Sequence, residues 1–284
     1  TRPQQLIEDL GDDLLEKFRG RPLISEYSVY EQLMSYWNDT MHDDVTLIGG
    51  SGWVDAAQPR EARITGYDNK KKPKYEAADL VFGTGGKAQR WVTDLIPPAL
   101  IVDRYFAEKK AELDRLTAEQ ERISQELLEY IEEHAVEEGL LWEAVNDDGG
   151  VKVGDARKRL KEAKAEGAEA EEIAALNHAV KLFAAETAAK KAVKDANLDL
   201  NLKTLATYSK LEKSAICGLV IERKWEVTVH TKIRLVGFLA TQQLTNRLEV
   251  LGQRYSSTLD ELQQESQGLQ SKVNEGLAKM GFWK

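Results

Sequence analysis

The chain has 284 residues, of which 42% are hydrophobic and 31% are charged, and its formal net charge is −9. The apolar fraction is high enough for a folded core, which excludes disorder along the whole chain. The negative balance argues against broad, unaided binding to nucleic acid or to an anionic membrane, because either surface requires a basic face on the protein.

Cysteine usage and hydropathy narrow the class further. The single cysteine, Cys217, excludes an intrachain disulfide and a cysteine-based zinc site, and it fits a reducing compartment such as the cytoplasm. No signal peptide is visible, and no apolar stretch approaches the roughly 20 residues that span a bilayer. Because the chain begins with Thr1 rather than Met, we expect it to be part of a longer protein.

The first third of the chain mixes helical and β patterns. Apolar residues recur every four positions from Leu6 to Phe18, which predicts a helix over residues 3–18, and a second helix is expected over 26–41, ending at Asp43-Asp44. Residues 45–48 favour a strand, and a charged loop between 63–67 and 75–78 predicts a hairpin. We therefore predict a small α+β domain over residues 1–97.

Residues 98–284 are predicted to form a helical domain. Pro97-Pro98 starts its first helix, because proline is tolerated in the first helical turn. A short basic helix is expected over 155–165, and long helices over about residues 98–138, 170–196, 225–251 and 257–280. The predicted fold class is mainly α, with a small α+β N-terminal part and long helices that carry coiled-coil-like seams.

Two seams are the most informative feature of these helices. The first seam has heptad spacing with a polar break at Gln120 and comprises Leu113, Leu116, Ile123, Leu127 and Tyr130. The second seam comprises Leu259, Leu262, Leu269, Val273, Leu277 and Met280. Because such stripes need another helix to cover them, we predict a partner interface formed by Leu113, Leu116, Ile123, Leu127, Leu259, Leu262, Leu269, Val273 and Leu277.

No group of residues predicts chemistry of comparable strength. The run from Gly83 to Lys87 lacks the first glycine and the final Ser or Thr of a phosphate-binding P-loop, and the glycines at 49–52 also indicate a turn. None of the four histidines has a second histidine or a cysteine at metal-ligand spacing. We therefore predict no catalytic, cofactor-binding or metal-binding residue in this chain.

A basic hairpin is the candidate contact with a phosphate backbone. Lys70, Lys71, Lys72 and Lys74 precede Tyr75, and three arginines, at positions 60, 63 and 90, would add to the same surface. The alternative is a solvated hairpin tip, where lysine discourages edge-to-edge pairing.

Several stretches, taken in order, resemble one family. They are Glu31-Gln32-Leu33-Met34-Ser35-Tyr36-Trp37, Met41-His42-Asp43-Asp44, Gly52-Trp53-Val54, Asp94-Leu95-Ile96-Pro97-Pro98-Ala99-Leu100-Ile101-Val102, Arg104-Tyr105-Phe106, Tyr208-Ser209-Lys210-Leu211, Leu219-Val220-Ile221-Glu222-Arg223-Lys224-Trp225, Leu244-Thr245-Asn246-Arg247, Arg254-Tyr255 and Lys279-Met280-Gly281-Phe282. In this order they resemble the C-terminal part of the modification (M) subunit of bacterial type I restriction–modification systems, over nearly the whole chain.

The resemblance implies an adenine-N6 DNA methyltransferase that uses S-adenosylmethionine. It also implies assembly with a specificity (S) subunit, a second M subunit and a restriction subunit, and contact with DNA through that complex. The family's catalytic domain carries a glycine-rich cofactor loop and an Asn-Pro-Pro-aromatic motif. Residues 96–99 read Ile-Pro-Pro-Ala and lack both the amide and the aromatic ring, so no catalytic residue is carried over.

Three interpretations follow from the sequence. The first is an assembly module that holds the methyltransferase domain on the S subunit and so on DNA. The second is a helical adaptor or scaffold that self-associates through the same seams. The third is an enzyme with a site between the α+β domain and the helices, although no residues that would serve such a site stand out.

Overall fold

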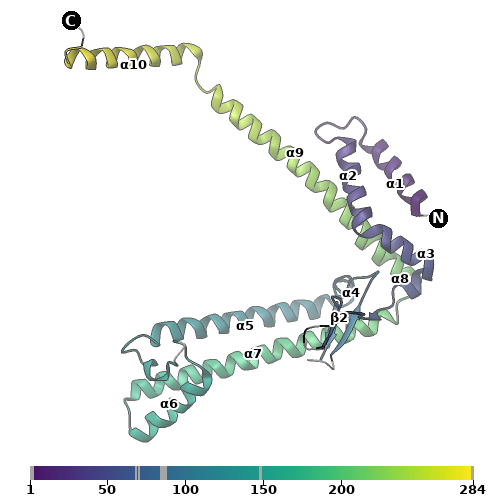
Figure 1. Ribbon diagram of the computed structural model, residues 1–284, viewed down its shortest axis with the longest axis vertical. Coiled ribbons are helices and arrows are strands. Elements are labelled where there is room, and N and C mark those ends of the chain that lie inside the picture. Colours follow the sequence, from purple (N-terminus) through teal and green to yellow (C-terminus); the bar gives the residue numbers. More distant parts are fainter. Residues whose placement is uncertain (1–2, 68, 70, 84–87, 147–148, 283–284) are drawn as a thin grey trace. The chain divides into compact units, whose positions relative to one another are not determined.

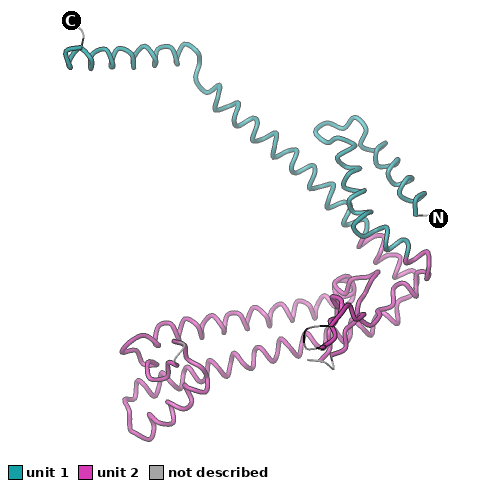
Figure 2. Tube along the Cα trace, in the orientation of Figure 1, with its two compact units in different colours: residues 1–46, 225–284 teal, residues 47–224 magenta. Residues whose placement is uncertain are grey.

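The computed structural model describes residues 3–67, 69, 71–83, 88–146 and 149–282, and the chain is 74% helical (Figure 1). The predicted fold class, mainly α with a small antiparallel β part, is confirmed. Contacts divide the chain into two compact units, residues 1–46 with 225–284 and residues 47–224 (Figure 2). This grouping differs from the predicted boundary at residue 97, because α2 (Glu26–Tyr36) packs on α9 (Val227–Arg254).

The core of the first unit gathers segments from both ends of the chain. Helix α1 (Pro3–Phe18) matches its prediction, and α2 continues through a π-helical turn, η1 (Trp37–Met41). Tyr36, Trp37 and Met41 are buried there. The apolar residues that pack against them are Leu6, Ile7, Leu10, Met34, Val45, Trp225 and Val229.

The predicted strand at 45–48 is wrong, and so is the helix end at Asp43-Asp44. Both segments lie in α3 (His42–Ala56). Val45 packs on the core one helical turn after Met41, so tertiary burial overrides the local β preference. Asp44 is buried and accepts a hydrogen bond from the indole Nε1 of Trp225 at 2.8 Å, which satisfies a polar group that burial would otherwise penalise.

The second unit contains two separate antiparallel sheets. Strands β1 (Arg60–Glu61), β5 (Gln89–Val92) and β4 (Leu80–Phe82) form one sheet in that order. Strands β2 (Ile64–Tyr67) and β3 (Pro73–Tyr75) form the other, which confirms the predicted hairpin.

Long helices make up the rest of this unit. They are α4 (Pro98–Tyr105), α5 (Ala107–His134), α6 (Val153–Glu166), α7 (Ala170–Tyr208) and α8 (Lys213–Cys217), joined by the 3-10 turn η3 (Trp142–Ala144) and followed by the π-helical η4 (Gly218–Glu226). The single helix predicted over 98–138 is interrupted at Phe106, whose φ of −134° is not helical. Helix α7 runs to Tyr208 rather than 196, because Leu200, Thr204 and Tyr208 are buried at four-residue spacing.

Tyr208 ties α7 to the segment that leads into α4. Its side chain is completely buried, and its hydroxyl donates a 2.6 Å hydrogen bond to the carbonyl oxygen of Ile96. Burial raises the pKa of the Tyr208 phenol, so it stays neutral in its donor role. The ammonium group of Lys224 binds the neighbouring Leu95 carbonyl at 2.7 Å, and Leu95, Ile96 and Ile101 are fully buried.

Candidate partner-docking surface

The first seam is covered by the chain itself. Helices α5 and α7 lie side by side (Figure 1) and run antiparallel, since partners of successive α5 residues fall at decreasing positions of α7. Lys109 binds Asp199, Ser124 binds Glu186, and the Tyr130 hydroxyl donates to the Ala175 carbonyl.

Burial along α5 follows the same pairing. Leu113, Leu116 and Ile123 are partly buried, and Leu127 is only 5% exposed. Leu182 of α7 is buried as well. These four residues, Leu113, Leu116, Ile123 and Leu127, were predicted to contact a partner, but α7 of the same chain packs along their helix instead.

Ionic contacts line the edge of the α5–α7 pair. The Lys109 and Lys203 ammonium groups hold the pKa of Asp199 below its ordinary value. The pKa of Glu186 is lowered by Lys190 and then by the hydroxyl of Ser124 on α5. Both carboxylates are thus charged acceptors at neutral pH, and each bonds one residue of α5, Lys109 or Ser124.

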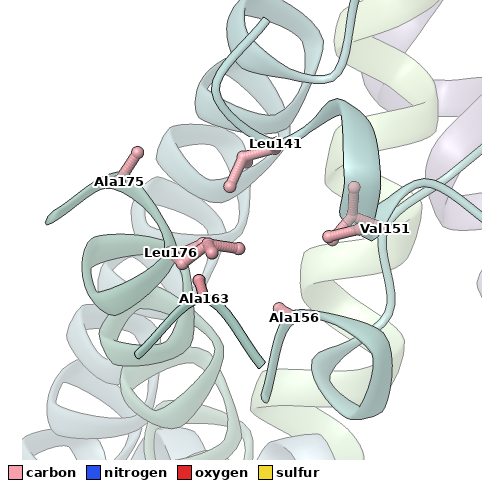
Figure 3. Close-up of a cluster of buried hydrophobic side chains, with 8 residues drawn as sticks. Leu141, Val151, Ala156, Ala163, Ala175 and Leu176 are labelled. Atoms are coloured by element: carbon pink, nitrogen blue, oxygen red, sulfur yellow. The ribbon is translucent and has the colours of Figure 1, made fainter. Parts of the chain in front are cut away.

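The far end of this pair is closed by α6 and the turns before it. Leu141, Val151, Ala156, Ala163, Ala175 and Leu176 point toward one another in a buried cluster (Figure 3). The Arg159 side chain, 13% exposed, forms ion pairs with Glu143 and Glu172 at 2.7 Å and with Glu166 at 3.2 Å. These contacts join η3, α6 and α7.

Helix α9 is covered over its first half only. Lys232 bonds the Ser35 hydroxyl of α2 at 3.4 Å, and an added Cβ on Gly237 would meet the Ile24 side chain at 3.4 Å. No residue of α9 is fully buried. Its exposed large apolar side chains are Val227, Leu235, Phe238, Leu239, Leu244, Leu248 and Val250.

Helix α10 (Leu259–Lys279) carries the second seam and is the most exposed helix of the described chain. Alternating steps of three and four residues give its a and d positions, of which Ser266 and Gly276 are not large apolar residues and Met280 directly follows the helix. These positions are Leu259, Leu262, Ser266, Leu269, Val273, Gly276 and Met280. Leu269 is 56% and Val273 is 60% exposed, and Leu277 is half-buried. Among the residues that the structure describes, no helix packs along this seam.

Local interactions hold α10 in helical form. The Thr258 hydroxyl accepts from the Glu261 amide at 3.3 Å, and the Glu261 carboxylate accepts from the Thr258 amide at 2.8 Å. These bonds lower the pKa of Glu261 and satisfy two amides that would otherwise lack helical partners. The apolar stripe of α10 is therefore presented on a capped helix.

The structure exposes the predicted interface residues of α10 on one face and shows a second exposed apolar surface on α9. Leu259, Leu262, Leu269 and Val273 are exposed on one face of α10, as a docking seam requires, with Leu277 beside them. The exposed α9 residues, among them Phe238 and Leu248, were not predicted. The helix itself was predicted over 225–251, but its apolar positions were not assigned to an interface.

The lysines lie on the β2–β3 ribbon. Lys71, Lys72 and Lys74 are exposed, whereas Lys70 lies outside the described residues. Arg60 is engaged elsewhere: it pairs with Glu76 and binds Asp94 at 2.6 Å. The Arg90 guanidinium lies 4.7 Å from the centre of the Tyr75 ring.

Gly49 and Gly50 do not form a loop that could hold a nucleotide or S-adenosylmethionine, because they lie inside α3. Gly83 follows β4 at a φ of 85°, and the rest of the second glycine cluster, residues 84–87, lies outside the described part. His134 and His178 both pack edge-on against the ring of Tyr130. Among the described residues, no three or more His, Cys, Asp or Glu side chains are grouped so that they could hold a metal ion.

Comparisons with protein-family models, with curated proteins and with solved structures each returned no match. Within the described ranges, no helix is both long and apolar enough to cross a bilayer. The geometry of the helices therefore carries the functional argument.

Proposed function

We propose that this chain is the assembly module of the modification subunit of a type I restriction–modification system. In this proposal α10 and the exposed part of α9 dock on helices of the S subunit, which holds the adenine-N6 methyltransferase domain on DNA. S-adenosylmethionine belongs to the catalytic part of the subunit, the second M subunit and the restriction subunit join the same complex, and the complex works in the cytoplasm.

The uncovered heptad stripe of α10 is the observation that carries this proposal. A helix with an apolar a/d stripe normally buries it against another helix. Leu259, Leu262, Leu269 and Val273 remain at least half exposed. The other seam of the same spacing, on α5, is covered by α7. A helical partner would complete α10 in the way that α7 completes α5.

Magnitudes indicate that α10 does not act alone. Complete burial of a Leu or Val side chain contributes about 1.5–3 kcal/mol, so covering the exposed half contributes about 1–2 kcal/mol per residue. The four exposed residues Leu259, Leu262, Leu269 and Val273 together supply about 4–8 kcal/mol, within the range of association costs of about 4–15 kcal/mol. Phe238 and Leu248 of α9 are exposed too, and we infer that they extend the contact.

The ordered family stretches support the choice of partner. The DNA methyltransferase resemblance runs through Asp94–Val102, Leu219–Trp225 and Lys279–Phe282, which fall in both units. In that family the C-terminal helices are expected to pack on paired helices of the S subunit, and α10 presents the stripe that such packing requires.

The test is capture of this chain by an immobilised S subunit encoded beside it. The double variant Leu269→Asp, Val273→Asp places two charges on the stripe, and we expect it to weaken binding at least about 100-fold. Both side chains are exposed, so the chain retains its fold.

A matched control separates the stripe from the helix as a whole. The variant Gln264→Asp, Ser271→Asp adds the same charge to the opposite face of α10, where both residues are exposed. We expect it to bind like the native chain. Undiminished capture of the stripe variant, or an equal loss in the control, would count against α10 as the docking helix.

Self-association is the second candidate, and the charges of α10 favour it. Glu265 and Lys272 are exposed at equivalent positions of successive heptads beside the stripe. Antiparallel pairing of α10 with a second copy would bring each Glu265 close to a Lys272. Sedimentation equilibrium tests this: Glu265→Lys should weaken a dimer, and adding Lys272→Glu should restore it. A monomer at all concentrations would exclude the adaptor function.

A further inference from the structure

The β2–β3 ribbon stands apart from the other sheet of its unit. Its two strands pair with each other and not with β1, β4 or β5. Ile64 and Tyr67 are exposed, Tyr67 to 68%. A two-stranded hairpin is only marginally stable by itself.

The base of the ribbon is fixed by charge. The Glu76 carboxylate accepts from the Arg63 amide at 2.6 Å and forms an ion pair with Arg60 of β1, which also binds Asp94. These bonds lower the pKa of Glu76 to about 2. The carboxylate is therefore held at the base of the ribbon by the Arg60 guanidinium and the Arg63 amide.

Strand register separates the ribbon into two chemically different faces. Tyr67 lies opposite Pro73, and Ile64 lies opposite Tyr75, so these apolar residues share one face. Lys74 lies opposite Gly66 and therefore on the other face, whereas Lys71 and Lys72 directly precede β3. Gly66 has no side chain, and the hydroxyl of its neighbour Thr65 donates a hydrogen bond to the Lys74 carbonyl oxygen at 3.3 Å.

We propose that three exposed lysines of the β2–β3 ribbon, Lys71 and Lys72 just before β3 and Lys74 within it, bind the phosphodiester backbone of nucleic acid. An exposed lysine ammonium group can neutralise one backbone phosphate. A two-stranded ribbon also fits the major groove, about 12 Å wide. Contacts of this kind position a protein without reading sequence.

The separation of the faces argues against a lipid surface. Membrane-binding surfaces place apolar and basic side chains side by side at one interface, whereas here Lys74 lies on the face opposite Ile64 and Tyr67. The whole chain has a net charge of −9, so nucleic acid binding is confined to this local surface and depends strongly on salt.

Fluorescence anisotropy of a labelled duplex of about 20 base pairs tests the proposal with the whole chain. Three phosphate contacts predict a slope of about −2.7 in log affinity against log salt, or a loss of about 40-fold between 50 and 200 mM salt. The triple variant Lys71→Gln, Lys72→Gln, Lys74→Gln should lose most of that binding and of that slope.

The matched control is the triple variant Lys158→Gln, Lys161→Gln, Lys164→Gln. It removes three positive charges from α6, where these lysines are also exposed, and it should bind like the native chain. Equal loss in both variants, or no binding by the native chain, would overturn the proposal. Tighter lysine-dependent binding to anionic vesicles than to DNA would overturn it in favour of a lipid surface.

Two further arms identify the nucleic acid and keep the two proposals apart. Tighter binding to the duplex assigns the ribbon to double-stranded DNA, and tighter binding to a single strand, weakened by Tyr67→Ala, assigns it to unpaired bases that stack on the ring. Either result supports the backbone contact when the lysine dependence holds. The α10 variant Leu269→Asp, Val273→Asp should bind DNA like the native chain, so loss of docking and loss of DNA binding are separable.

Discussion

Helices α5 and α10 carry apolar stripes of the same heptad spacing but opposite exposure. Leu127 on α5 is 5% exposed, whereas Leu269 on α10 is 56% exposed. After α5, the turns and α6 reverse the chain, so that α7 returns along the stripe. No helix in the described part of the chain returns along α10. The comparison teaches that an apolar seam in a sequence predicts packing against another helix. Whether that helix belongs to the same chain depends on how the chain folds after the seam.

Truncating one leucine on each stripe gives the largest contrast. We expect Leu127→Ala to lower the free energy of unfolding by about 2–4 kcal/mol, because it leaves a cavity between α5 and α7. The melting temperature should fall by about 5–15 °C. Leu269→Ala should change stability by less than about 0.5 kcal/mol, since its side chain is already in water. Equal effects in calorimetry would break the comparison.

Breaking the ionic cluster at the end of the α5–α7 pair is the next test. Arg159→Ala leaves Glu143, Glu166 and Glu172 without their shared cation, so we expect a loss of about 1–3 kcal/mol in urea unfolding. Arg122 on α5 pairs with two glutamates but is 61% exposed, and Arg122→Ala should cost at most about 0.5 kcal/mol. A larger effect at Arg122 would show that surface pairs, rather than the closed end, stabilise this unit.

The same distinction explains how far the sequence predicts the fold. The bounds of helix 3–18 were predicted correctly because its apolar residues recur every four positions without a break, which is typical of one face of an α-helix. The strand predicted at 45–48 was wrong because local β preference competes with burial of Val45 against Met41, which is 4% exposed. Tyr208 extends α7 through contacts with residues more than a hundred positions away, which no local pattern contains.

The candidate site was predicted unevenly for the same reason. The stripe of α10 is a local property, so Leu269 and Val273 were found from spacing alone. Leu127 is buried by α7, which is distant in the sequence, so the heptad spacing alone could not show whether α7 or a partner protein contacts this residue. Exposure of Phe238 depends on where α2 ends its contact with α9, which sequence spacing does not give.

Removing the cap of α10 sharpens the comparison at about 1 kcal/mol. Thr258→Ala deletes the hydroxyl that accepts from the Glu261 amide, and a lost N-cap typically costs about 1 kcal/mol. Because α10 has no tertiary cover, hydrogen exchange of its amides should accelerate about fivefold, while the melting of the α5–α7 pair stays unchanged. Ser257→Ala, one residue earlier, is the control and should leave exchange as it is.

Acid pH gives the smallest expected effect and acts on the covered seam. The pKa of Asp199, ordinarily 3.8, is lowered by Lys109 and Lys203, and that of Glu186, ordinarily 4.5, by Lys190 and Ser124. Since both pKa values are lower in the folded chain, their stabilising contribution is complete above pH 4.5 and is lost as the pH falls below 3.8 toward the folded values.

The melting temperature as a function of pH measures this contribution. The native chain should melt above the variant Asp199→Asn, Glu186→Gln at neutral pH, and the difference should shrink below pH 3.8. Lys109→Met should reproduce the part that belongs to Asp199, because it removes the cation that spans α5 and α7. A difference that stays constant into strong acid would mean that α7 covers the first seam through apolar contacts alone, with no ionic contribution from its edge.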